Sequence, residues 1–224
     1  MIKSLSGLEE IQMMKYRGKN SPLKVRISGV VLAAGESSRI GGTKQLLAFR
    51  GSTILGRVIE NARESLLDEI IVVLGHDATE IRTRVDFAGV QVVLNDDYKQ
   101  GQSSSLKMGL NNVSGGSRAA MFLLGDQPLV DERVINKMIR AYEESLSPIV
   151  IPVFAGRRGN PVVIGRELFG DLAIAAKDDA GARVLFNQNA GLIHYVEMDS
   201  SFIHADVDTP EDYNNLINNI KNGR

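Results

Sequence analysis

The chain contains no cysteine and only three histidines, His76, His194 and His204, none of them in an H-E-x-x-H pattern. Without cysteine there is no disulfide, no thiolate zinc site, no iron–sulfur cluster and no cysteine nucleophile. Carboxylates then remain as the main metal-binding side chains, and they suit hard cations such as Mg²⁺. A metal site in this chain is therefore expected to be built from acidic residues.

The chain also lacks an excess of either charge and any long hydrophobic run. Its 26 basic and 27 acidic side chains give a net charge of −1, which argues against a broad nucleic-acid-binding face. No segment reaches the ~18 consecutive apolar residues of a membrane span, and residues 1–28 carry too many charges for a signal peptide. We therefore expect a cytoplasmic protein that binds neither nucleic acid nor a membrane.

Hydrophobic residues make up 43% of the 224 positions, which is enough to bury the core of one ordinary domain. Residues 1–26 are interpreted as an N-terminal extension and residues 27–224 as a single domain. From residue 28 onward, apolar runs typical of strands buried on both faces alternate with amphipathic helical patterns. Four such alternations indicate an α/β fold with a parallel sheet wrapped by helices.

The predicted elements can be given by their residue ranges. The strands are expected at 29–34, 70–74, 90–94, 119–124 and 149–153, and the helices at 53–67, 78–85, 103–111 and 131–145. The pattern weakens after Phe154, where strands are expected at 161–164 and 193–196 with short helices between them. A last helix is expected to begin at Pro210, with Thr209 as its N-cap and Asp212 three residues after the cap.

The most distinctive segment follows the first predicted strand and reads LAAGESSRIGGTK from Leu32 to Lys44. Small residues and glycines at such a position let backbone N–H groups approach a phosphate closely. Arg39 and Lys44 supply the positive charge that a nucleoside triphosphate needs. The spacing fits neither the P-loop nor the dinucleotide fingerprint, and the alternative interpretation is a flexible turn with solvated charges.

A second segment, Gly125-Asp126-Gln127-Pro128, comes directly after the fourth predicted strand. A carboxylate that leaves the end of a buried parallel strand lies in the crevice where α/β sheets bind ligands. We interpret Asp126 as a Mg²⁺ ligand, the alternative being an ordinary turn aspartate.

A third segment, Asp206 to Asp212, is rich in carboxylates and precedes the last predicted helix. Extended backbone would direct Asp206 and Asp208 to the same side, where they could complete a metal site. Acidic residues beside a helix N-terminus are also favoured by the macrodipole. We prefer that explanation for Glu211 and Asp212, and both explanations stay open for Asp206 and Asp208.

Read together, these segments resemble one family, the molybdenum-cofactor nucleotidyltransferases, and most closely their cytidylyltransferase branch. The resemblance runs from about Val30 to Leu216. The family opens with an L-A-[AG]-G-x-S-x-R-[MI]-G-x-x-K loop, which this sequence matches at Leu32, Ala33, Ala34, Gly35, Ser37, Arg39, Ile40, Gly41 and Lys44. Ala34, and the Gln-Leu-Leu that follows Lys44, are typical of the cytidylyltransferase branch. Gly101–Leu106, Gly125–Pro128, Gly156–Pro161 and Asp179–Arg183 resemble further family segments.

The resemblance implies a Rossmann-like three-layer fold and a Mg²⁺-dependent transfer of a cytidylyl group from CTP to molybdopterin or the molybdenum cofactor, with release of pyrophosphate. A molybdenum hydroxylase is a further partner that it suggests. The implied catalytic residues are Arg39, Lys44 and Asp126, and the implied metal ligands are Asp126, Asp206 and Asp208. The nucleotide is expected at Leu32, Ala33, Ala34, Gly35, Arg39, Lys44, Gly101, Gln102, Ser103 and Ser104. The acceptor is expected at Arg157, Arg158, Asn160, Asp179 and Arg183.

Two residues on the acceptor side depart from the family pattern. Asn160 stands where the family has a histidine, and Asp178 where it has a glycine. The acceptor therefore stays open between a molybdopterin and another phosphorylated compound, such as a sugar or alcohol phosphate. A different step of molybdoenzyme maturation and a non-enzymatic role as a cofactor carrier are further alternatives.

Overall fold

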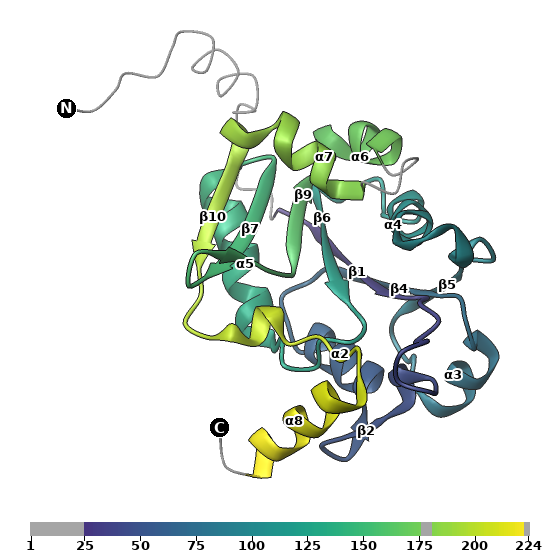
Figure 1. Cartoon of the computed structure of the whole chain (residues 1–224). Coiled ribbons are helices and arrows are strands. Elements are labelled where there is room, and N and C mark those ends of the chain that lie inside the picture. Colours follow the sequence, from purple (N-terminus) through teal and green to yellow (C-terminus); the bar gives the residue numbers. More distant parts are fainter. Residues whose placement is uncertain (1–24, 176–180, 222–224) are drawn as a thin grey trace, which may run out of the picture.

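The computed structural model describes residues 25–175 and 181–221, without the side chains of 181–184 and 219–221. A mixed sheet runs through the molecule in the order β10-β7-β9-β6-β1-β4-β5 (Figure 1). Its strands are β1 (Ile27–Ala33), β4 (Glu69–Leu74), β5 (Gln91–Leu94), β6 (Ala119–Leu124), β7 (Ile149–Phe154), β9 (Val162–Gly165) and β10 (Ile193–Glu197). A short β8 (Arg157–Arg158) pairs with β7.

The central strands are parallel, as the alternating pattern predicts. β1 pairs in parallel with β4 on one side and with β6 on the other, and β10 pairs in parallel with β7. β9 runs antiparallel to both of its neighbours. The predicted α/β fold with a mostly parallel sheet is therefore confirmed.

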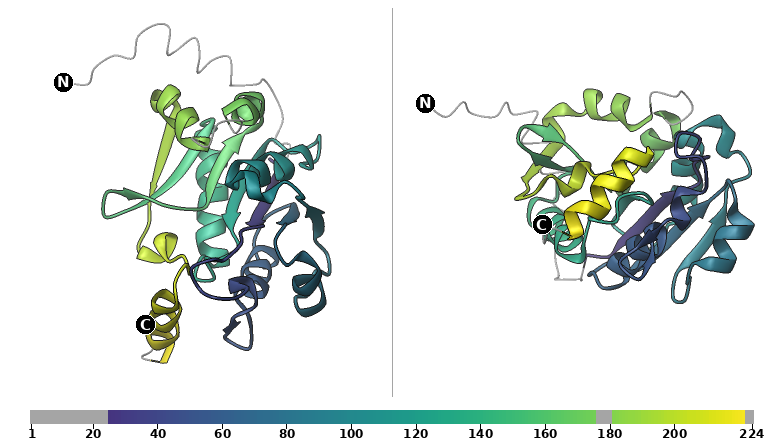
Figure 2. Two further views of the ribbon diagram at one scale, coloured as in Figure 1. Left: turned by 45° about the vertical axis from the view of Figure 1, so that its right-hand side comes forward. Right: turned by 60° about the horizontal axis from the view of Figure 1, so that its bottom comes forward.

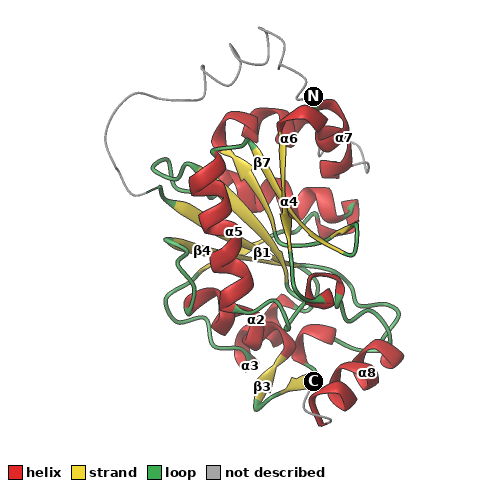
Figure 3. Cartoon of the chain, turned by 90° about the vertical axis from the view of Figure 1, so that its left-hand side faces the viewer, coloured by secondary structure: helices red, strands yellow, loops and turns green. Residues whose placement is uncertain are grey.

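Helices cover both faces of the sheet, which gives three layers (Figures 1 and 3). One face packs against α2 (Ile54–Arg63), α3 (Ala78–Arg84) and α5 (Glu132–Ser145). The other packs against α4 (Gln102–Asn111), α6 (Phe169–Ala175) and α7 (Gly181–Gln188). Successive β1 residues pack on opposite faces of the sheet. Val31 belongs to the core with α2, α3 and α5, and Val30 to the core with α4, α6 and α7. This period of two explains why the strands read as continuous apolar runs.

A smaller core forms between the last described helix and an early hairpin, which lie at the same end of the molecule (Figure 2). The hairpin consists of β2 (Ala48–Phe49) and β3 (Ser52–Thr53), which the sequence did not predict, and the helix is α8 (Pro210–Lys221). Phe49 and Val207, both at 1% exposure, are buried together in this core. This packing holds the segment just before α8 beside the β2–β3 hairpin.

The observed helix ends have local causes. α2 ends at Arg63, four residues before the predicted end, where the Ser65 hydroxyl donates to the Ala62 carbonyl. α5 is capped by Asp131, whose carboxylate accepts from two backbone amides of the first turn. At α8, Thr209 and Asp212 exchange hydrogen bonds between side chains and backbone, which confirms the predicted cap as a capping box.

Candidate functional site

A cleft lies at the carboxyl edge of the parallel strands, where β1 and β6 end. Its volume is about 410 Å³. Ligands of open α/β sheets bind at this edge. The cleft is lined by Leu32, Ala33, Ala34, Gly35, Glu36, Ser37, Ser38, Arg39, Lys44, Gln45, Tyr98, Lys99, Gly101, Gln102, Ser105, Leu124, Gly125, Asp126 and Asp208.

The loop after β1 forms one wall of this cleft. It turns at residues 37–40, where the Ile40 amide donates to the Ser37 carbonyl at 3.1 Å. Among the residues that the structure describes, the amide hydrogens of Gly35, Glu36, Ser37 and Ser38 have no protein acceptor. Unused N–H groups beside a cavity can bind an anion. The loop therefore has the property that the sequence predicts for a phosphate-binding segment.

The Lys44 ammonium lies between two carboxylates. Its Nζ is 2.5 Å from Asp126 Oδ2 and 2.7 Å from Asp208 Oδ1. Arg39 reaches the other oxygen of Asp208 at 2.9 Å. The two cations proposed for the triphosphate and two of the three proposed metal ligands thus meet in one cluster.

The backbone brings the two aspartates together across a long stretch of sequence. The Val207 amide donates to the Asp126 carbonyl at 3.1 Å, so the residue before Asp208 is bonded directly to the end of β6. Gly125 allows this end of β6 to approach β1, because a Cβ there would lie 2.7 Å from the Ala33 Cβ. On the far side, the Asp208 and Thr209 amides both donate to the Asp212 carboxylate. Asp208 is therefore held from both directions along the chain.

Burial and neighbouring charge act differently on the two carboxylates. Asp126 has a side chain only 17% exposed, and this burial raises its pKa against the opposing effect of Lys44. Hydrogen bonding to Lys44 instead lowers the pKa of the more exposed Asp208. The pKa of Lys44 is raised, because the attraction and hydrogen bonds of its two partners together outweigh the burial that would lower it.

One oxygen of this cluster has no partner. Asp126 Oδ1 is buried and accepts no hydrogen bond within the described residues. Mg²⁺ is commonly held by one or two carboxylates together with substrate phosphates. Asp126 and Asp208 are a donor set of that kind, and the unpartnered oxygen is available to a hard cation.

Asp206, the third proposed ligand, is placed differently. Its side chain is exposed and does not line the cleft, although its charge contributes to raising the pKa of Asp126. Within residues 25–175 and 181–221, no three acidic or histidine side chains are grouped so as to hold a metal ion. The structure therefore brings together two of the three proposed carboxylates.

The opposite wall comes from a short 3₁₀ turn and the start of α4. Gly101, at φ +96°, turns the chain into the helix. Gln102 and Ser105 then line the cleft, three residues apart on one helix face. Ser103 is buried outside the cleft lining, and the Ser104 hydroxyl bonds the Asp97 and Gly101 carbonyls. Neither of these serines is placed against the cleft, although the sequence predicts both as nucleotide contacts.

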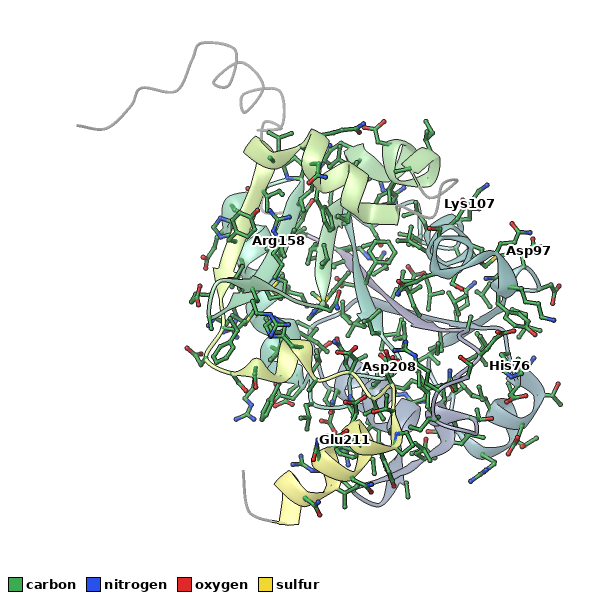
Figure 4. All side chains as sticks on the ribbon, viewed as in Figure 1. His76, Asp97, Lys107, Arg158, Asp208 and Glu211 are labelled. Carbon is green, nitrogen blue, oxygen red and sulfur yellow. The ribbon has the colours of Figure 1, made fainter. Side chains whose placement is uncertain are left out.

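Of the proposed acceptor residues, the described Arg157, Arg158 and Asn160 do not line the cleft. Arg158 bonds the Tyr195 hydroxyl at 2.5 Å and lies over its ring. Figure 4 shows Arg158 beside β7 and β10, apart from Asp208. Arg157 is exposed in the same hairpin, and the backbone N–H of Asn160 donates to the Ile203 carbonyl. Asp179 and the side chain of Arg183 lie outside the described residues.

The sequence analysis missed several residues that line the cleft. Gln45, Tyr98, Lys99 and Ser105 are among them. Tyr98 stacks on His76 at 5.8 Å between ring centroids, and Lys99 lies near the Tyr98 ring. Their positions follow two of the parallel strands, and this placement at the carboxyl edge is the signal that could have indicated them.

The cleft lies at the carboxyl edge of a parallel sheet and combines free backbone amides, two cations and a pair of carboxylates. Such a site suits the transfer of a group between phosphates. The fold and the site together define the class of nucleotidyltransferases. Comparison with known proteins narrows this class. The chain belongs to the family of the MobA-like NTP transferase domain, whose family model matches residues 29–192. It is a nucleotidyltransferase of that family.

Three relatives indicate how the family varies. Nicotine blue oxidoreductase of Paenarthrobacter nicotinovorans is 31% identical over 85% of this chain and 96% of its own length. Molybdenum cofactor cytidylyltransferase of Escherichia coli is 27% identical over 84% of this chain and 93% of its own. The crystal structure of Rv0371c from Mycobacterium tuberculosis in complex with manganese is 30% identical, covers 87% of this chain and 99% of its own, and superimposes with a TM-score of 0.75.

Within the part of the chain that the structure describes, no helix has both the length and the hydropathy needed to span a bilayer.

Proposed function

We propose that this nucleotidyltransferase moves a cytidylyl group from CTP to a molybdopterin-type acceptor in the presence of Mg²⁺, releasing pyrophosphate. The observation that carries the proposal is the contact of Lys44 with both Asp126 and Asp208 beside a loop of free amides. A 27% identical relative named for this reaction supports the choice of nucleotide and acceptor.

In the proposed reaction, a phosphate oxygen of the acceptor attacks the α-phosphorus of CTP. The new P–O bond replaces the bond to the bridging oxygen, and pyrophosphate leaves with that electron pair. No nucleophilic side chain is needed, since such transfers depend on positioning and charge neutralisation. Arg39, Lys44 and the amides of residues 35–38 bind the triphosphate and stabilise the charge that develops on pyrophosphate.

Asp126 and Asp208 are the residues that would hold the metal ion, which when bound supplies positive charge to the phosphate oxygens. Lys44 contacts the same two carboxylates, so it keeps them close together while their charges would otherwise repel. Gln102 and Ser105 line the cleft from α4, and the proposal assigns the ribose or base to them.

We expect the acceptor to bind at the side of the cleft nearer β7 and β8. Arg157 and Arg158 are the described cations there, with Asn160 between them and the loop before α8. Because Arg158 is engaged with Tyr195 rather than directed into the cleft, a second acceptor class stays in consideration. That class is a sugar or alcohol phosphate.

The test measures pyrophosphate release with CTP, GTP, ATP and UTP, each offered with molybdopterin, molybdenum cofactor, a sugar phosphate or an alcohol phosphate. We expect release with CTP and a molybdopterin acceptor, and its loss in Asp126→Ala. Release only with a sugar or alcohol phosphate would support the second acceptor class. Tight pterin binding without pyrophosphate release in any mixture would refute both and favour a carrier.

A further inference from the structure

Gln45 is almost completely buried beneath the loop that follows β1, with 2% of its surface exposed. It lies in the 3₁₀ turn Lys44–Leu46, directly after the lysine that joins the two carboxylates. Its side chain borders the cleft, yet every hydrogen bond that the structure gives this side chain goes to the loop.

The three hydrogen bonds use the whole primary amide. Nε2 donates to the Ala33 carbonyl at 3.2 Å and to the Gly35 carbonyl at 3.3 Å. Oε1 accepts from the Ser37 hydroxyl at 3.1 Å. Only a primary amide supplies two N–H donors and a carbonyl acceptor from one planar group. Glutamate at this position would direct oxygens at two carbonyls, and methionine would leave all three partners without a bond.

These bonds also occupy backbone carbonyl oxygens of a segment that lines the cleft. Ala33 and Gly35 are two residues apart, so in extended backbone their carbonyls point to the same side. The carbonyl between them, that of Ala34, accepts from the His76 amide at 3.2 Å. All three carbonyl oxygens of the segment are thereby occupied by donors, while the amides of residues 35–38 are free.

The same network reaches Lys44. The Ser37 hydroxyl that donates to Gln45 also accepts from the Lys44 backbone amide at 3.3 Å. Ser37 has a positive φ of +55°, a conformation that a serine rarely adopts without local support. On the other side of Gln45, Leu46 is buried in the core, and its 3₁₀ turn contacts α2 and α3. Gln45 is therefore held between a fixed core residue and the loop.

We propose that Gln45 is a positioning residue for the triphosphate: it withdraws the Ala33 and Gly35 carbonyl oxygens from the cleft and fixes the loop so that its amides, with Lys44, receive phosphate oxygens. The inference rests on the proposed binding of a nucleoside triphosphate to this loop. A carbonyl oxygen left free beside a polyphosphate would repel it, because the partial negative charge on that oxygen would face a negatively charged group.

The test compares Gln45→Met, which keeps the length of the side chain but not its hydrogen bonds, with wild type. Calorimetry measures the dissociation constants of Mg²⁺-pyrophosphate and of cytidine for each protein. We expect the constant for pyrophosphate to rise about tenfold or more, and the constant for cytidine to change less than about twofold. Gln91→Met is the matched control, because Gln91 is exposed on β5 and loses a single hydrogen bond to Asn112.

A double-mutant cycle with Ser37→Ala separates positioning from general loss of structure. Ser37→Ala alone is expected to weaken pyrophosphate binding about threefold, and to have almost no further effect in the Gln45→Met background. If Gln45→Met does not fold, Ser37→Ala carries the test alone, and unchanged pyrophosphate binding overturns the proposal.

Two further outcomes also overturn the inference. One is pyrophosphate affinity of Gln45→Met within about twofold of wild type, and the other is an equal weakening of pyrophosphate and cytidine. Wild type that binds neither CTP nor pyrophosphate refutes the proposed function itself and the inference with it. Wild type that binds both while Gln45→Met is unaffected refutes only the role of Gln45.

Discussion

Replacement of Lys44 by methionine tests whether the cluster of Lys44, Asp126 and Asp208 is a coupled unit. The change keeps an unbranched side chain but leaves two carboxylates without the ammonium between them. Removing one member of a fully buried ion pair costs about 3–5 kcal/mol, whereas exposed pairs contribute about 0–1 kcal/mol. The side chains here are 13%, 17% and 30% exposed, so the expected loss of stability lies between these limits. We expect about 2–3 kcal/mol at pH 8, or a fall in Tm of about 4–12 °C.

The loss should depend on pH in a defined direction. The raised pKa of Asp126 means that its folded form binds a proton more readily than its unfolded form. Stability from this group therefore falls as pH rises from 3.8 through the folded pKa. Lys44 opposes that shift, so the folded pKa of Asp126 rises further in Lys44→Met. The stability difference between the variant and wild type should therefore shrink as the pH is lowered from 8 toward 5.

Metal ions provide the second measurement in this experiment. In wild type, the Lys44 ammonium competes with a metal ion for the two carboxylates. Mn²⁺ added in the absence of nucleotide should therefore raise the Tm of the variant more than that of wild type, because a ligand that binds the folded state stabilises it. Lys99→Met is the matched control, since Lys99 lines the same cleft but is near an aromatic ring rather than a carboxylate. We expect that control to stay within about 0.5 kcal/mol of wild type. Equal stability of Lys44→Met and wild type at pH 8, or an equal effect of Mn²⁺ on both, would refute the reasoning.

Three other substitutions have expected outcomes. Asp126→Ala should fold and unfold cooperatively yet lose on the order of 10²–10³ in turnover; steady-state pyrophosphate release measures this, and near wild-type turnover would contradict the metal assignment. Thr209→Ala should lower the free energy of unfolding by about 1 kcal/mol through loss of the α8 cap, with a larger fall in metal affinity than Ser200→Ala causes at the cap of the 3₁₀ turn Ser201–His204; urea denaturation and Mn²⁺ titration test both. Arg158→Ala should raise KM for the acceptor and leave KM for CTP unchanged, and a change confined to CTP would place the acceptor elsewhere.

Much of the fold could be predicted because strand and helix periods are local. The runs at 70–74 and 119–124 coincide with β4 and β6 to within a residue, since strands buried on both faces are apolar throughout. The hairpin of β2 and β3 escaped prediction because strands of two residues carry no period. Its place is fixed instead by packing of Phe49 against Val207 and α8, which is a contact between distant parts of the sequence.

The site was predictable in its charged residues and less so in its geometry. Lys44 and Asp126 follow buried parallel strands, so the sequence could place them at one edge of the sheet. The contrast between Ser103 and Ser105 depends on where α4 begins, because a shift of one residue rotates the face of the helix directed at the cleft. The hydrogen-bonding role of Gln45, unlike its place at the sheet edge, could not be predicted, since its partners are mainly backbone carbonyls, which every residue type possesses.

The bond between the Val207 amide and the Asp126 carbonyl joins parts of the site that are synthesised at different times. Lys44 and Asp126 are 82 residues apart, but Lys44 and Asp208 are 164 apart. At about 5–20 residues per second, roughly 4–16 s of translation separate the appearance of the first aspartate from that of the second. During that interval a nascent chain can form the sheet edge with a lysine and one carboxylate, but not with the pair. The sheet edge can thus form before the carboxylate pair, which is complete only after Asp208 has been synthesised.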